Sequence, residues 1–274
     1  MQNAQKVIRT VGYCRATVIE DSIRRNGTRL VTFELDYPRI IHSQVMTHRV
    51  FSRNAQSSRA TPTRAFLKAL EKEHYIPAIW REAARGMAAG GELSARAAGL
   101  CTEVWEQQFR YALRAAEGLA NLGAAKEHVN RLLEPFGFIR VLVTATDWAN
   151  FFSLRLAPDA QPEIRDLARA MKQAMADSTP VRTGEHMPYL TTRERTHPQK
   201  GLISAARCAR VSYMTFDDKE PDVEADIQLA RRLLRDRHMT PFEHQAFASE
   251  ECGRYANLTD WVSQRFLFEH PGEA

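Results

Sequence analysis

A polar segment at residues 47–59 holds the side chains of this sequence that are best suited to chemistry. It reads Thr-His-Arg-Val-Phe-Ser-Arg-Asn-Ala-Gln-Ser-Ser-Arg and combines arginines, a histidine, serines and two side-chain amides. Such donors suit a phosphate, an electron-rich ring, or both. This density of polar groups is typical of a binding site rather than of a core. A solvated, charged surface loop is the alternative interpretation.

Composition agrees with an anionic ligand without selecting one. The 274 residues carry a net charge of +5, and the isoelectric point is about 9.1. This balance favours a nucleotide, a nucleic acid or a phosphorylated cofactor, although a mildly basic solvated surface gives the same figures. No apolar run is long enough to span a bilayer, and residues 1–9 lack the apolar core of a signal peptide. The cysteines are scattered, which fits a reducing cytosol, so we expect a cytoplasmic protein: Cys14, Cys101, Cys208 and Cys252.

Several common catalytic motifs are absent. The sequence has no GxGxxG, GxxxxGK[ST], HExxH or GxSxG pattern. Classical dinucleotide folds, P-loop enzymes, zincins and serine hydrolases are therefore disfavoured, and we expect no metal site.

The elements that must position the polar segment follow from periodicity. Residues 29–35 alternate between apolar and polar and predict a strand. Pro38 suits the start of a helix over residues 40–51, on which Gln44 and His48 share a face. Asp147 suits the cap of a helix that carries Asn150 and Arg155. Further helices are predicted at residues 65–75, 92–119, 124–133, 161–176 and 223–236, with a loop at 180–199. We expect one mixed domain over residues 1–274.

The segment 47–59 resembles the signature of the flavin-dependent thymidylate synthases, RHRxxSxNxxSxR. It matches every fixed position except the first, where Thr47 replaces arginine. Gln44 precedes the signature as in the family, and Arg131 lies in a segment similar to the family's arginine-containing helix. Residues 150–155 (Asn-Phe-Phe-Ser-Leu-Arg) and 160–165 (Ala-Gln-Pro-Glu-Ile-Arg) resemble the block NFLxLR…AQxEIR.

Two more blocks resemble the family but occupy unusual places. Residues 205–213 are similar to its AARVSY opening, and residues 237–244 to its HxTPFEH block. Both precede the signature in the family and follow it here. We therefore infer a circularly permuted α+β fold, with helices packed on an antiparallel sheet and the family's N-terminal blocks relocated to about 200–250. The second block also has the form of a helix capping box, which is itself suited to a phosphate.

The resemblance implies transfer of a one-carbon unit from methylene-tetrahydrofolate to C5 of dUMP, forming dTMP. FAD would carry the hydride and NADPH would reduce the flavin. Active sites would be shared in a cytoplasmic homotetramer, with no membrane or nucleic-acid partner. Matched positions assign the substrate to Gln44, Ser57, Arg59, Arg131 and Arg155, with Arg155 as the catalytic residue. They assign the flavin to Thr47, His48, Arg49, Asn54, Asn150, Ser212, His238, Thr240 and Glu243.

Two departures leave the substrate open. Thr47 removes a cation near the flavin, and Ala55 stands where the family usually has glutamate. The segment around residues 144–147 is also shorter than in the family. The alternatives are the same scaffold acting on UMP or leaving a hydroxymethyl group, and a basic nucleic-acid-binding protein.

Overall fold

A mostly antiparallel sheet forms the centre of the protein. The computed structural model describes residues 8–9, 13–86, 90–211 and 222–272. The strands β1 (Ile8–Arg9), β2 (Arg15–Ile23), β3 (Arg29–Pro38), β5 (Phe138–Ala145) and β4 (Ser52–Ala55) lie side by side in that order, and β6 (Val181–Arg182) adds in parallel to β2. The predicted strand at 29–35 is confirmed within β3.

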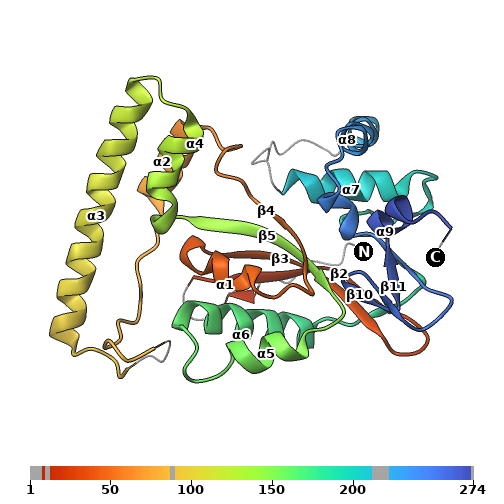
Figure 1. Ribbon diagram of the computed structural model, residues 1–274, viewed down its shortest axis with the longest axis horizontal. Helices are drawn as coiled ribbons and strands as arrows, with labels where there is room; N and C mark the ends of the chain where they lie inside the picture. The colour runs from red at the N-terminus through yellow and green to blue at the C-terminus, as the bar shows by residue number, and fades with distance from the viewer. Residues whose placement is uncertain (1–7, 10–12, 87–89, 212–221, 273–274) are drawn as a thin grey trace.

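One face of this sheet carries the main apolar core. Phe33 and Leu35 of β3 and Val141 and Val143 of β5 point to this face and are fully or almost fully buried. They pack in one cluster with α6 (Pro162–Asp177), whose first residue is the proline suited to a helix start. The short helix α5 (Ala149–Arg155) packs beside α6 (Figure 1). This face therefore positions residues 149–165.

The C-terminal third covers the opposite face. There α7 (Lys200–Arg210) packs through Cys208 against Leu142 of β5, and α8 (Val223–Arg235) packs on α7 (Figure 1). A small sheet follows, in the order β11 (Trp261–Ser263), β8 (Ala246–Ala248), β7 (Glu185–His186). Five shorter elements complete this layer: η3 (Glu194–Thr196), η4 (Thr240–Glu243), β9 (Arg254–Tyr255) and β10 (Leu258–Thr259), which form a hairpin, and α9 (Gln264–Glu269).

A buried chain of polar groups joins this layer to the central sheet. His186 Nε2 lies 2.7 Å from Thr32 Oγ1, which lies 2.6 Å from Thr144 Oγ1, and Thr144 Oγ1 lies 2.8 Å from His244 Nδ1. All four side chains are fully buried. Buried polar groups are costly unless they are hydrogen-bonded, so this chain ties the C-terminal layer to the sheet in one register.

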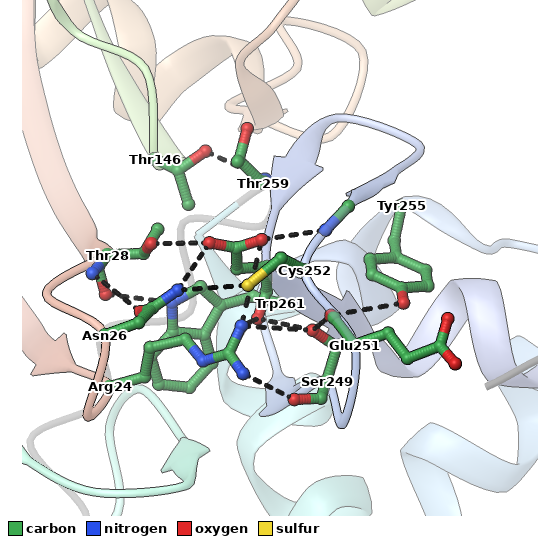
Figure 2. A network of polar contacts seen from close by, with 12 residues as sticks. Arg24, Asn26, Thr28, Thr146, Ser249, Glu251, Cys252, Tyr255, Thr259 and Trp261 are labelled. Carbon is green, nitrogen blue, oxygen red and sulfur yellow. Dashed lines mark hydrogen bonds and ion pairs between the residues drawn. The ribbon is translucent and has the colours of Figure 1, made fainter.

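A second polar network, drawn in Figure 2, fixes the β2–β3 turn to the C-terminal hairpin. Asp260 accepts hydrogen bonds from Asn26 Nδ2 (2.8 Å), Thr28 Oγ1 (2.7 Å) and the Gly253 amide (2.8 Å). Arg24 adds a bond of 2.8 Å to the Ser249 carbonyl. Residues more than 200 positions apart are thereby joined at the surface.

A helical layer extends from the other end of the sheet (Figure 1). The long helix α3 (Ala95–Asn121), capped by Ser94, packs with η2 (Asn130–Phe136), α4 (Lys126–Val129) and α2 (Thr63–Lys72). Its core contains Leu70, Phe109, Leu133 and Phe136. This layer carries Arg131 and lies against the end of the signature segment.

The expected α+β class, with helices packed on an antiparallel sheet, is confirmed, but some predicted boundaries are wrong. The helix expected over 40–51 is η1 (Arg39–Ile41) followed by α1 (His42–Met46), and the chain then turns into β4. The helix expected over 124–133 is α4 over residues 126–129, followed by the 3-10 helix η2, which contains Pro135. The loop expected at 180–199 includes β6, β7 and η3. Among the described residues, no helix combines the length and apolarity that crossing a membrane requires.

Candidate active site

The signature segment runs along the edge of the central sheet. It leaves α1 at Thr47, turns through residues 47–51, forms the edge strand β4 and ends in a loop beside η2. Strand pairing is Ser52 with Thr144 through Ala55 with Val141. Because side chains alternate along a strand, this edge sends neighbouring residues to opposite faces. The polar string therefore serves two different surroundings.

Arg155 brings the signature and the block at residues 150–155 together. Its Nε donates to His48 Nε2 at 3.0 Å. Its Nη2 donates to the Gln44 carbonyl at 3.3 Å and to Thr47 Oγ1 at 3.2 Å, and Nη1 approaches Gln44 Oε1 at 3.5 Å. We call Gln44, Thr47, His48 and Arg155 the arginine cluster. Four of the predicted site residues thus meet at one place.

The arginine cluster is supported from α6 and α1. Gln44 Nε2 donates to Oε1 of Gln161, the residue just before α6. Thr47 Oγ1 donates to the Gln44 carbonyl at 2.7 Å, which closes the last turn of α1. Gln161 belongs to the second matched block, but the resemblance assigned it no contact. Its place beside Gln44 could have been inferred from that block.

His48 is a neutral hydrogen-bond acceptor in this arrangement. Burial, and secondarily the charges of Arg155 and Arg53, lower the pKa of His48 to about 4. Its ring packs edge-on against Phe151 and stacks with Phe51. Because Nε2 accepts from Arg155, the proton of the neutral ring lies on Nδ1. Burial also lowers the pKa of Arg155, although arginine stays charged at neutral pH.

Arg53 is a further cation of the segment that the sequence analysis did not single out. It donates to the carbonyls of Met46 (2.7 Å) and His48 (3.2 Å), so it fixes the turn before β4. Burial lowers the pKa of Arg53, while the charge of Glu243 raises it. Arg53 stands at a position that the family signature does not specify, so the resemblance gave no indication of this role.

The segment η4 lies against β4, which brings the C-terminal block to the signature. Glu243, which ends η4, also forms an ion pair of 2.6 Å with Arg265. His238 and Thr240 are exposed at the surface. Ser212 lies outside the described residues. The circular permutation requires this proximity of residues 240–244 and 44–59, and the permutation itself stays a prediction.

Asn54 faces the other side of the sheet from the arginine cluster. It is buried, and its Nδ2 donates to the Cys208 carbonyl in α7 at 2.7 Å. Its side-chain nitrogen therefore fixes α7 to the edge strand. Two other predicted flavin residues, Arg49 and Asn150, are exposed, on the turn after α1 and on α5 respectively.

The remaining predicted substrate residues form a second group near η2. Arg59 pairs with Glu127 at 3.1 Å, and both side chains are exposed. Ser57 is half-buried and Arg131 is exposed on η2. Their neighbour Ser58 donates to Glu134 at 2.7 Å, which also pairs with Arg39 at 2.9 Å. The structure thus places Gln44 and Arg155 together in the arginine cluster. It places Ser57 and Arg59 on the loop after β4 and Arg131 on η2, outside that cluster.

Comparison with known proteins identifies the family. The family model described as Thy1, thymidylate synthase complementing protein, matches residues 29–181, more than half of the chain. The chain belongs to this family. It is therefore an enzyme, a nucleotide methyltransferase, and the match includes the signature, Arg131 and Arg155. It ends before the two C-terminal blocks. A search of curated proteins found no match.

Two solved structures resemble this chain at low identity. Both are described as the UMP/dUMP methylase PolB from Streptomyces cacaoi, one bound with 5-Br dUMP and one with 5-Br UMP. The first has 21% identity and a TM-score of 0.44, with 54% of this chain and 66% of that chain covered. The second has 17% identity and a TM-score of 0.48, with 61% and 90% covered. Such scores are too low to transfer a substrate.

Proposed function

We propose that this protein transfers a one-carbon unit from methylene-tetrahydrofolate to C5 of dUMP, forming dTMP, with FAD as the hydride carrier and NADPH as the reductant. The observation that carries the proposal is the arginine cluster, in which Arg155 contacts Gln44, Thr47 and His48. A charged fork held at three points is pre-organised for a planar ring with carbonyl oxygens.

In this proposal Arg155 is the catalytic residue. Its guanidinium exchanges the bonds to Thr47 and the Gln44 carbonyl for bonds to the uracil ring. It then stabilises the negative charge that develops on the ring as C5 reacts. His48 acts as the fixed acceptor that keeps Nε of Arg155 oriented during this exchange. Gln44, held by Gln161, orients the nucleotide. Because His48 and Gln161 hold Arg155 and Gln44, reorganisation is confined to this exchange of bonds when the ring binds.

The cofactor surface is proposed around the same cluster. FAD, when bound, supplies reversible hydride transfer. The donor set fits an anionic, phosphate-bearing ligand, because Arg49 on the turn after α1 and Asn150 on α5 are exposed donors. We propose that Thr47, His48, Arg49, Asn150, His238, Thr240, Glu243 and Ser212 line the flavin. Asn54 would act through α7, whose carbonyl at Cys208 it binds.

We further propose that the site is completed between subunits of a homotetramer in the cytoplasm, each subunit a permuted domain spanning residues 1–274. Two features support shared sites. The substrate residues Ser57, Arg59 and Arg131 lie on other elements than the arginine cluster. The helix α3 also presents exposed apolar side chains on one stripe, at Leu100, Val104 and Tyr111. A second subunit would bury that stripe.

One observation favours a second candidate, the same chemistry on UMP or with a hydroxymethyl product. Thr47 accepts a hydrogen bond from Arg155 where the family signature has a cation, and Ala55 offers only a methyl group on β4. Both changes remove charge from the segment, so they affect substrate choice more than the fold.

A product assay tests the proposal. Purified protein with FAD, NADPH and methylene-tetrahydrofolate is incubated with dUMP or with UMP, and the nucleotide product is measured by mass spectrometry. Conversion of dUMP to a product heavier by one methylene unit supports the proposal. Conversion of UMP alone, or a hydroxymethyl product, supports the second candidate. A protein that binds no flavin and converts neither nucleotide contradicts both.

A further inference from the structure

Four arginines line one shallow hollow on the outer side of the C-terminal layer. The hollow measures about 520 Å³ and is formed by the end of α7 and one face of α8. Its described lining consists of Arg210 together with Ala225, Gln228, Leu229, Arg231, Arg232 and Arg235. No carboxylate belongs to this lining. We call it the arginine groove.

The charges of the arginine groove are only partly balanced. Arg210 bonds to Asp226 at 2.7 Å, and this buried aspartate also pairs with Arg207. Within the described part of the chain, the exposed side chains of Arg231 and Arg232 make no hydrogen bond or ion pair. Arg235 reaches Asp236 only at 3.5 Å, with both groups exposed, so this contact contributes little. Two to three positive charges therefore face solvent without a fixed partner among the described residues.

Helix stability alone does not explain this arrangement. Arg231 and Arg235 are spaced i, i+4 on α8, and like charges at that spacing repel by about 0.2–0.5 kcal/mol. The helix dipole favours cations in the last turn of α8 and offsets part of this repulsion. Arg210 reaches the same hollow from α7, where its bond to Asp226 of α8 holds it. An anion between the two helices would balance the charges.

The surroundings limit the size of that anion. Asp222 and Glu224 stand at the first turn of α8, and Asp236 follows its last turn. Along α8 these carboxylates precede and follow the arginines of the lining, so a long polyanion that continued along the helix in either direction would meet negative charge. The lining also contains Leu229, Ala225 and Gln228, whose amide nitrogen donates to Glu224 at 3.1 Å. A short, highly charged ligand fits this pattern best.

We propose that the arginine groove binds a compact ligand that carries two or more linked phosphate groups. Arginine forks bind phosphate oxygens in pairs, and the forks of Arg231, Arg232 and Arg235 can hold adjacent phosphates, with the charge of Arg210 beside them although its fork is bonded to Asp226. Binding is favoured because the negative charges of the ligand neutralise the exposed positive charges of the arginines. The site lies on α7 and α8, apart from the arginine cluster, and does not depend on the proposed methyl transfer.

Calorimetry with inorganic tripolyphosphate and orthophosphate tests this site in the full-length protein. At about 150 mM salt, long-range attraction between exposed charges is largely screened, so remaining affinity reports local contacts. We expect tripolyphosphate to bind at least about tenfold more tightly than orthophosphate. The double variant Arg231→Gln/Arg235→Gln should weaken tripolyphosphate binding by about tenfold or more. The matched control Arg110→Gln/Arg114→Gln, which removes two exposed i, i+4 arginines from α3, should bind like the unchanged protein.

Three outcomes would overturn the proposal. One is the absence of tripolyphosphate binding by the unchanged protein, and another is equal binding by the groove variant whose circular dichroism is unchanged. The third is tighter binding of a single-stranded oligonucleotide that depends on the same arginines, which would make the groove a nucleic-acid surface. Turnover of dUMP is measured in parallel, and its presence or absence leaves the phosphate result unaffected.

Discussion

The Nε of Arg155 donates a 3.0 Å hydrogen bond to Nε2 of His48 across 107 residues of sequence. This contact joins the signature turn to the end of α5, and it requires a neutral histidine. The charge of the arginine and the low pKa of His48 support each other, because a protonated ring would face the guanidinium. The candidate site is built around this pair.

Replacement of Arg155 should abolish most of the proposed activity while leaving the fold intact. We expect Arg155→Ala to lower kcat by about 10²–10³-fold, since it removes the donor that meets developing charge. Arg155→Lys should recover little, because an ammonium group lacks the planar fork. Steady-state kinetics measure the loss, and flavin absorbance reports cofactor content. The variant Arg169→Ala, at an exposed position on α6, is the control. Unchanged turnover in Arg155→Ala would rule out a catalytic role for Arg155.

The acid limb of activity should lie well below the usual histidine range. The pKa of His48 is lowered to about 4 by burial and by nearby arginines, so the ring stays a neutral acceptor above that pH. We expect kcat/KM to hold as the pH falls to about 5. The variant His48→Gln, which keeps a side-chain acceptor, should retain more activity than His48→Phe. A pH profile that falls with a midpoint near 6.5 would contradict this assignment.

The buried histidines should make folding stability sensitive to acid. Burial lowers the pKa of His244 to about 3 and that of His186 well below its usual value. The unfolded chain binds these protons more readily, so their contribution to stability is full above about pH 6.5 and declines as the pH falls. At pH 5 the expected loss is about 2 kcal/mol per histidine. Urea unfolding from pH 8 to pH 5 measures this loss of stability. The absence of a decline over that range would contradict the neutral, buried state of His186 and His244.

Asp260 should stabilise the junction between the β2–β3 turn and the C-terminal hairpin (Figure 2). It accepts bonds from Asn26, Thr28 and the Gly253 amide, and its own φ is +60°. Asp260→Ala removes all three acceptor contacts from a strained position and should lower the free energy of unfolding by about 1–3 kcal/mol. Asp260→Asn, which tolerates positive φ, should cost less. The exposed Asp159→Ala serves as the control in urea titrations.

The exposed stripe on α3 should determine the assembly. Val104 and Tyr111 are 58% and 59% exposed, which is unusual for large apolar side chains on one helix face. We expect the double variant Val104→Glu/Tyr111→Glu to dissociate the proposed tetramer. Light scattering measures its mass, and Glu103→Gln with Gln107→Glu on the same helix tests for a general surface effect. A mass that is unchanged in the first variant would exclude this stripe as the interface.

Local pattern in the sequence determined the parts of this protein that depend on near neighbours. Alternation over residues 29–35 predicted β3, and helical periodicity predicted α3 and α6. These elements follow from strand and helix geometry, which involves residues only a few positions apart. The resemblance to the family's sequence blocks marked Gln44, His48 and Arg155 as candidates.

Only the tertiary structure decided how those residues are used. The helix before the signature ends at Met46 because the chain must enter β4 and pair with β5. Asn54, in the same string as His48, faces α7 instead of the arginine cluster, because alternate residues of a strand point to opposite faces. The low pKa of His48 arises from burial and from Arg155, a residue distant in sequence. Such effects depend on long-range packing, which spacing along one chain does not encode.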